Sequence, residues 1–372
     1  MNVAAGEIGF VAAVAFLKSH PELLEINAHV RQRRGDERAP VVVIRCDAGH
    51  ALGLGHLVRC LAVAAVLRDR FAAAVTFALG GDPALAAAVR EQAFPVTLLP
   101  GRDRAGELAA VLAATGADAL LMDLRTPYDA AEIQAIRAAG CRFALLDDGG
   151  DRRLDADLAY YPPSGLWLDW RGAHGQRFAG WDWLALRPQF SPPPPYRPTE
   201  PPVALILAGG SDPHGLGNRL LRIAAAALPA EWRLMLVLGR ATVADPGFEA
   251  LAARLGDRLT LVRDVTEMAA LMAGASLALS VFGGTAYELA AVGVPTILLG
   301  LDADHARSAA TLAEAGAALF AGIAAEVEDE TLAAALAGLA ADPGRRALLS
   351  ATARTLIDGR GANRIAESLL HI

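Results

Sequence analysis

A short stretch of residues carries groups that can bind a ligand and move a proton. Residues 45–60 read RCDAGHALGLGHLVRC and include Arg45, Asp47 and His56. An imidazole exchanges protons near neutral pH, so His56 is a candidate general base. Asp47 could orient that imidazole or cap a turn. Arg45 could contact a sugar or a phosphate, or pair with a carboxylate elsewhere in the fold.

The flanking residues predict the elements that position this stretch. The apolar run Val41–Ile44 predicts a buried strand, Gly53 and Gly55 allow a tight turn, and the amphipathic stretch Leu57–Leu67 predicts a helix. His56 then falls in the first helical turn at the C-terminal edge of a sheet, where open α/β proteins bind ligands. The alternative is a glycine turn that only packs helix on strand, because short glycine motifs often match by chance.

Composition limits the class of protein. The chain has 372 residues, enough for about two domains, and a net charge of −7 that gives no reason to expect nucleic-acid binding. No apolar run reaches the length that crosses a bilayer, so we expect no stable membrane insertion. Three cysteines without CxxC spacing fit a reducing, cytoplasmic compartment and no zinc site. We expect no metal and no cofactor.

Short apolar strands alternate with helices along most of the chain, which predicts βαβ units and parallel sheets. The proline-rich stretch Ser191–Pro202 divides this alternation into two runs and predicts a stiff linker. We therefore expect an N-terminal extension and linker at 1–39, one Rossmann-like domain at 40–195, and a second at 196–372. The expected strands are Val41–Arg45, Ala74–Ala78, Val96–Leu99, Ala119–Met122 and Phe143–Leu146, then Val203–Ala208, Leu234–Leu238, Leu259–Val262, Leu277–Ser280 and Thr296–Leu299.

Three loops in the second run follow predicted strands, and the two that are rich in glycine could hold a diphosphate. Glycines let backbone N–H groups approach an anion, and a helix N-terminus adds partial positive charge. Glu288, one turn into its helix, could accept hydrogen bonds from ribose hydroxyls. The alternative is a set of ordinary turn glycines and a carboxylate that complements the helix dipole. The loop residues singled out are Gly209, Gly210, Ser211 and Asp212, then Val265, then Gly283, Gly284 and Thr285.

These motifs together resemble a known family. The segment VRDVTEMAALMAGASLALSVFGGTAYELAAVGVPTILL resembles the uridine-diphosphate half-site of GT-B enzymes. From Val41 onward the chain is similar to the UDP-sugar hydrolases of pseudaminic acid biosynthesis. The matching pieces are Arg45-x-Asp47, Gly53-x-Gly55-His56-x-x-Arg59-Cys60, Asp147-Asp148, Leu186-Arg187-x-x-Phe190, Gly209-Gly210-x-Asp212-Pro213, Gly283-Gly284-Thr285 with Glu288, and Asp358-Gly-x-Gly361.

The resemblance implies a GT-B fold and a metal-independent hydrolase with His56 as the base. That enzyme would cleave UDP from a UDP-linked diacetamido-trideoxy sugar by attack of water at the anomeric carbon. Arg187 would contact sugar or phosphate, or pair with Asp147 or Asp148. The chain departs from the family pattern at several positions, among them Gln189, where the family usually has glutamate.

Three questions stay open from the sequence. A glycosyltransferase with the same UDP-sugar donor site would carry the same nucleotide motifs. A nucleotide-sugar binding protein that has lost catalysis would carry them as well. Residues 1–39 could dock another enzyme of nonulosonate synthesis, and no chemistry can be assigned to them.

Overall fold

The computed structural model describes residues 38–48, 55–99, 104–209, 212, 215–238, 246–263 and 265–370. Most of the predicted extension, residues 1–37, lies outside these ranges. So do three predicted site residues, Gly53, Gly210 and Ser211.

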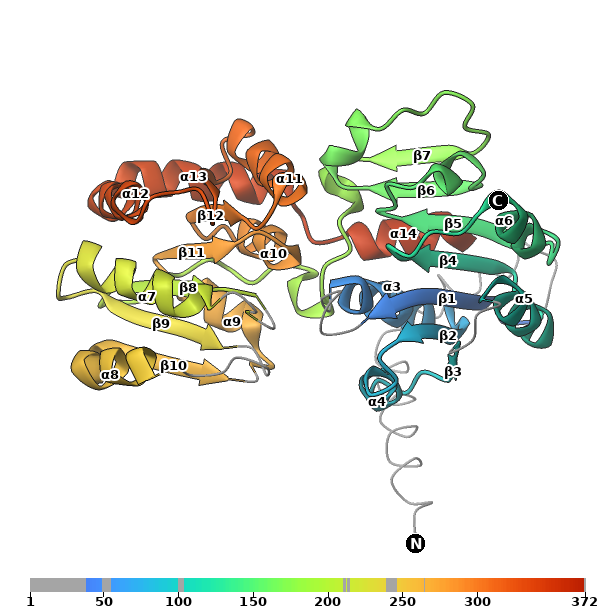
Figure 1. The fold of residues 1–372 in the computed structure, drawn as a ribbon, viewed down its shortest axis with the longest axis horizontal. Helices are drawn as coiled ribbons and strands as arrows, with labels where there is room; N and C mark the ends of the chain where they lie inside the picture. The colour runs from blue at the N-terminus through green and yellow to red at the C-terminus, as the bar shows by residue number, and fades with distance from the viewer. Residues whose placement is uncertain are drawn as a thin grey trace, which may run out of the picture.

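The described residues form two parallel sheets, of seven and six strands, which are separate halves of the molecule in Figure 1. The first half has the order β3-β2-β1-β4-β5-β6-β7, and the second has β10-β9-β8-β11-β12-β13. Every strand pairs with its neighbours in parallel. The predicted fold class, two facing Rossmann-like sheets, is confirmed.

The strands of the first half are β1 (Val41–Ala48), β2 (Ala74–Gly81), β3 (Val96–Leu98), β4 (Ala119–Asp123), β5 (Arg142–Leu146), β6 (Leu158–Tyr161) and β7 (Gln176–Ala179). Those of the second half are β8 (Val203–Leu207), β9 (Arg233–Leu238), β10 (Leu259–Arg263), β11 (Leu277–Val281), β12 (Thr296–Gly300) and β13 (Leu319–Ile323).

The main helices of the first half are α3 (Gly55–Phe71), α4 (Leu85–Glu91), α5 (Arg104–Thr115) and α6 (Ala130–Arg137). The second half has α7 (Leu216–Ala227), α8 (Pro246–Leu255), α9 (Met268–Ala273), α10 (Gly284–Val292), α11 (Ala303–Glu314), α12 (Asp329–Ala341) and α13 (Pro343–Leu356). The last helix, α14, covers Gly361–Leu370.

Helix α14 lies with the first half, although it follows the second half in the sequence. Ile365 and Leu369 are buried in the same core as Val42 and Ile44 of β1. In Figure 1 α14 lies among the strands and helices of the first half. Burial of these apolar side chains at about 25 cal/mol per Å² holds the returning helix in place.

Three strands, β6, β7 and β13, were not expected from the sequence. Strand β7 is short and largely exposed, so it lacks an apolar run. Strand β13 lies in an alanine-rich stretch whose composition also suits a helix. Parallel pairing to β6 and to β12 gives these segments strand structure, which is a tertiary effect.

The segment Leu184–Phe190 connects the halves and packs tightly against the start of α14. A Cβ on Gly361 would lie 2.1 Å from the Leu184 carbonyl oxygen. A Cβ on Gly359 would lie 1.9 Å from the Phe190 carbonyl oxygen, and Gly359 has φ +75°. Only glycine fits at both positions, so this crossing has a fixed geometry.

Candidate active site

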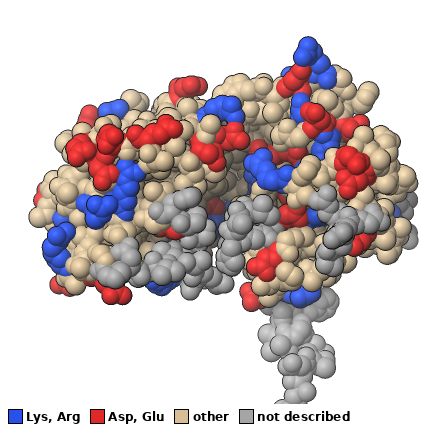
Figure 2. All heavy atoms as spheres, viewed as in Figure 1, with Lys and Arg blue, Asp and Glu red and all other residues tan. Residues whose placement is uncertain are grey.

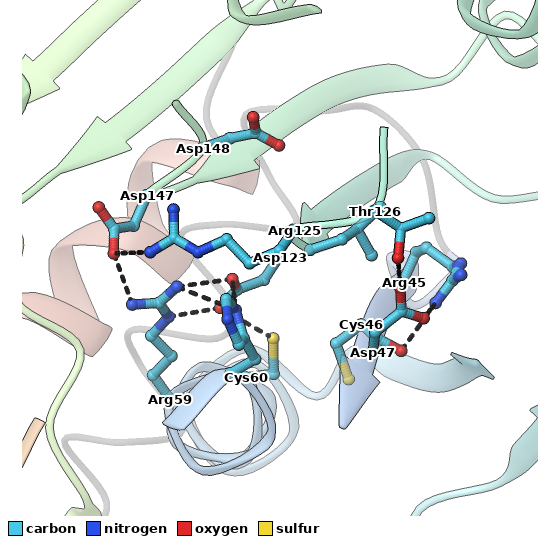
Figure 3. Close-up of polar contacts among 12 residues, drawn as sticks. Arg45, Cys46, Asp47, Arg59, Cys60, Asp123, Arg125, Thr126, Asp147 and Asp148 are labelled. Carbon is cyan, nitrogen blue, oxygen red and sulfur yellow. Dashed lines mark hydrogen bonds and ion pairs between the residues drawn. The ribbon is translucent and has the colours of Figure 1, made fainter. Parts of the chain in front are cut away.

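The centre of the candidate site is a buried carboxylate shared by a histidine and an arginine. Asp123 ends β4 and is fully buried, with Oδ1 2.5 Å from His56 Nδ1. Arg59 donates from Nε to Oδ2 at 2.5 Å and from Nη2 to Oδ1 at 2.7 Å. His56 and Arg59 are three residues apart on α3, so both side chains reach the same strand end. Figure 3 shows Arg59 at the Asp123 carboxylate.

Asp123 stays ionised because of Arg59. Burial disfavours the charged carboxylate, but the Arg59 guanidinium outweighs burial and, with hydrogen bonds from Arg59 and His56, lowers the pKa of Asp123 to about 2. The Cys60 thiol lies 3.7 Å from Oδ2 and is held protonated, because burial raises its pKa well above the usual range. An ionised Asp123 accepts the Nδ1 proton of His56, which leaves Nε2 as the basic nitrogen.

Arg59 also links this carboxylate to the end of β5. Its Nη1 donates to Asp147 Oδ2 at 2.7 Å, and Figure 3 shows Arg59 between the two carboxylates. Asp147 has φ +52°, a conformation that costs energy in a non-glycine residue. The neighbouring Asp148 is buried and pairs with Arg152 instead. The two adjacent aspartates therefore have different roles, and Asp147 is the one that belongs to the site.

The expected partnership of Asp47 with His56 is wrong. Asp47 accepts from Arg45 Nη1 at 2.6 Å and from Thr126 Oγ1 at 2.6 Å, in a group separate from Arg59 in Figure 3. The reason is the direction of β1, which places Asp47 beside β2, where a Cβ on Gly80 would lie 2.3 Å from Asp47 Oδ1. Asp123 takes the role expected of Asp47.

Arg45 is placed behind the site. Its side chain is 1% exposed and pairs with Asp47, not with Asp147 or Asp148. Burial opposes its charge, yet the Asp47 carboxylate and Tyr128 raise the pKa of Arg45, so it stays cationic. A direct contact of Arg45 with substrate remains a prediction that this geometry does not favour.

In the second half, glycines open the N-terminus of α10. The helix begins at Gly284 after the extended Gly283, with no acidic side chain in its first turn. A Cβ at either glycine would meet nothing within 4 Å, so the backbone there is accessible. Thr285 belongs to the same turn, and its N–H is unpaired within the helix, as in any first turn.

Two other predicted residues have local structural partners. Asp212 accepts from the backbone N–H groups of Leu216 at 2.8 Å and Gly217 at 2.9 Å, so its carboxylate caps α7. Val265 lies between β10 and α9 and packs at the edge of the core beneath α10. Ligand contacts of Gly209, Asp212 and Val265 remain predictions.

Glu288 is held by an arginine from the connecting segment. Arg187 donates from Nε at 2.7 Å and from Nη2 at 2.6 Å to the two carboxylate oxygens. The Glu288 side chain is 6% exposed and that of Arg187 26%. The predicted ribose residue thus already has a fixed bidentate partner, which sequence spacing alone could not reveal because the two residues are 101 positions apart.

Tyr287 of α10 is within electrostatic range of two charged residues of the first half. Burial raises the pKa of Tyr287, and the charge of Asp147 raises it further while Arg59 lowers it. Tyr287 precedes Glu288 on α10. The charged residues of the first half therefore influence the helix that carries Glu288, the residue predicted to bind the ribose. Figure 2 shows the surface hollowed between the two halves.

Among the helices that the structure describes, none is long and apolar enough to cross a membrane. Within the same ranges, no three His, Cys, Asp or Glu side chains are placed to share a metal ion.

No family model matches the chain. The spore coat polysaccharide biosynthesis protein SpsG of Bacillus subtilis is 27% identical over 341 residues, which cover 88% of this chain and 97% of SpsG.

Two solved structures share the fold. UDP-GlcNAc 2-epimerase from Neisseria meningitidis, bound to UDP-GlcNAc, matches with TM-score 0.62 and 13% identity, covering 89% of this chain and 99% of its own. CalG4, the calicheamicin glycosyltransferase, matches with TM-score 0.58 and 17% identity, covering 89% and 98%. The chain has the GT-B fold.

Proposed function

We propose that this protein is a GT-B enzyme that breaks the bond between the anomeric carbon of a UDP-linked sugar and its diphosphate. The observation that carries the proposal is the His56–Asp123 contact at the strand ends of the first half, next to the helix of the second half that would bind the nucleotide. This proposal concerns the step that is common to hydrolysis and glycosyl transfer.

The geometry supports a defined path for the proton and the electrons. Asp123 accepts the Nδ1–H of His56, so Nε2 can take a proton from a hydroxyl oxygen. That oxygen attacks C1 of the sugar, and the bond from C1 to the diphosphate oxygen breaks. The electron pair leaves with UDP, and the proton is left on His56. Arg59 keeps Asp123 ionised throughout, and the Asp123 carboxylate stabilises the imidazolium while Arg59 Nη2 lies 3.1 Å from His56 Nδ1.

The second half would hold the leaving group. Backbone N–H groups at Gly283–Thr285 and the partial positive charge of α10 would stabilise the developing charge on the diphosphate. The uracil would lie near Val265 and the ribose at Glu288. The UDP-GlcNAc bound to the Neisseria meningitidis epimerase, which shares this fold, supports a UDP-sugar as ligand.

The nucleophile separates the two candidate reactions. Similarity to a polysaccharide biosynthesis protein and to a glycosyltransferase supports transfer to an acceptor hydroxyl better than hydrolysis. Hydrolysis by water is the second candidate, and it is favoured by the His56 and Arg187 motifs of the UDP-sugar hydrolases. In both reactions the same imidazole activates the attacking oxygen.

Product analysis tests the proposal. The purified protein is incubated with a panel of UDP-sugars, with and without sugar acceptors, and UDP, free sugar and transferred product are separated. Release of UDP with an acceptor-linked product supports transfer, and UDP with free sugar supports hydrolysis. His56→Ala is the matched control, and both products should disappear with it. Binding of UDP-sugars without any cleavage would contradict the proposal and leave a binding protein.

A further inference from the structure

We propose that Arg187 is a positioning residue that sets recognition of the ribose by presenting the Glu288 carboxylate to the sugar hydroxyls. The inference rests on the proposed function, because it assumes that the nucleotide lies at α10. It assigns to the segment between the two halves a part in nucleotide selectivity.

The pairing geometry is the first argument. Arg187 uses Nε and Nη2 for the two Glu288 oxygens, at 2.7 and 2.6 Å, so both groups are locked in one plane. A carboxylate has about four lone-pair sites, and the bidentate pair uses one on each oxygen. The remaining sites lie on opposite outer sides of the carboxylate and keep a fixed direction, so that one side can accept from a ribose hydroxyl. A ribose diol offers two such donors, and its 2′,3′-dideoxy analogue offers none.

Burial is the second argument. The Glu288 side chain is 6% exposed, so water cannot solvate its charge. Without Arg187 the carboxylate would have no bidentate countercharge and no fixed orientation. A buried acceptor with free rotation would bind a diol less selectively than one held in place.

The third argument is that Arg187 is itself held. Phe190 is fully buried, and the Arg187 guanidinium lies 5.3 Å from its ring centroid. Gln189 donates to the Thr266 carbonyl oxygen at 3.0 Å and accepts from the Ala269 N–H at 2.7 Å. The segment therefore touches both the predicted ribose residue and the loop predicted to hold the uracil.

Calorimetry with two nucleotides tests the inference. UDP and 2′,3′-dideoxy-UDP are titrated into the wild type, Arg187→Lys and Arg187→Gln. The wild type should prefer UDP by about 10-fold or more, as expected for hydrogen bonds to a charged acceptor. Both variants should bring the ratio of the two affinities close to one. Arg187→Lys keeps a positive charge beside the buried Glu288 carboxylate but cannot form the bidentate pair. It therefore tests the inference even where Arg187→Gln does not fold.

The matched control is Arg171→Lys, the same exchange in an exposed pair with Asp169 of the first half. It should leave the ratio of the two affinities as in the wild type, whatever it does to UDP affinity itself. An unchanged ratio in folded Arg187→Lys would overturn the inference and leave the proposed function intact. Failure of the wild type to bind UDP at all would overturn both.

Discussion

The two halves of the molecule share a strand order but differ in what their strand ends carry. In both sheets the first strand, β1 or β8, lies beside the fourth, β4 or β11. In the first half β4 ends in Asp123, and α3 adds His56 and Arg59. In the second half β11 is followed by glycines that open the N-terminus of α10. The same scaffold thus presents charged side chains on one side and backbone N–H groups on the other.

This difference indicates a division of labour. Proton transfer needs an ionisable side chain in a fixed place, and a network of ion pairs provides it in the first half. Binding of a diphosphate needs hydrogen-bond donors with no negatively charged side chain beside them, and the glycine turn at α10 provides such donors in the second half.

Asp123→Asn should be the most damaging change in the first half. It leaves Arg59, whose side chain is 23% exposed, with the Asp147 carboxylate as its remaining counter-charge, and it replaces the fully buried carboxylate that fixes the His56 tautomer by a neutral amide. We expect a loss of about 3–5 kcal/mol in the free energy of unfolding. Urea unfolding measures the loss. Asp69→Asn, in an exposed pair with Arg68, is the control and should cost under about 1 kcal/mol. Equal stability of the two variants would show that the network is not structural.

Acid should weaken the first half through the same carboxylate. The pKa of Asp123 is about 2 in the folded protein, below the ordinary value of about 3.9. A depressed pKa gives stability that is present above the unfolded value and is lost as the pH falls through the folded one. The contribution is about 2–3 kcal/mol, lost mostly between pH 4 and 2. Urea unfolding against pH should show this loss in the wild type and a smaller one in Asp123→Asn.

Gly80→Ala should disturb the buried Arg45–Asp47 pair. The new Cβ would lie 2.3 Å from Asp47 Oδ1 and 2.8 Å from Arg45 Nη2, so the pair must shift. We expect a loss of about 1–3 kcal/mol, as for other overpacked sites, measured by thermal unfolding. Gly338→Ala, in helix α12 with nothing within 4 Å, is the control and should be neutral or stabilising. The opposite order of the two variants would contradict the packing described at β2.

Thr126→Val should have the smallest effect. It removes the 2.6 Å hydrogen bond to Asp47 Oδ2 while keeping the side-chain volume. Because Arg45 still holds the carboxylate, we expect a loss of about 1 kcal/mol in chemical unfolding. Thr355→Val, whose hydroxyl bonds only a carbonyl of its own helix, gives the baseline. A loss no larger than that baseline would mean that Thr126 does not support Asp47.

The sequence predicts the elements better than the contacts among side chains. Periodicity and glycine turns place β1, α3 and the α10 loop, because these signals are local. The His56–Asp123 contact spans 67 positions and Arg187–Glu288 spans 101, so neither appears in local spacing. From the sequence, Asp47 could orient His56 or cap a turn, and local spacing does not bring Asp123 into that choice. Sequence periodicity does not fix the strand order. In the structure β4 lies beside β1, and this order brings Asp123 to His56.

The most direct test of the account compares His56→Ala with Glu288→Ala in single-turnover cleavage of a UDP-sugar substrate, alongside calorimetric UDP affinity. His56→Ala should lower the rate at saturating substrate by about 10²–10⁴-fold and leave UDP affinity unchanged. Glu288→Ala should weaken UDP binding by about 1.5–3 kcal/mol and recover most of its rate at saturation. Cleavage by His56→Ala as fast as by the wild type would contradict the account and show that His56 is not the base.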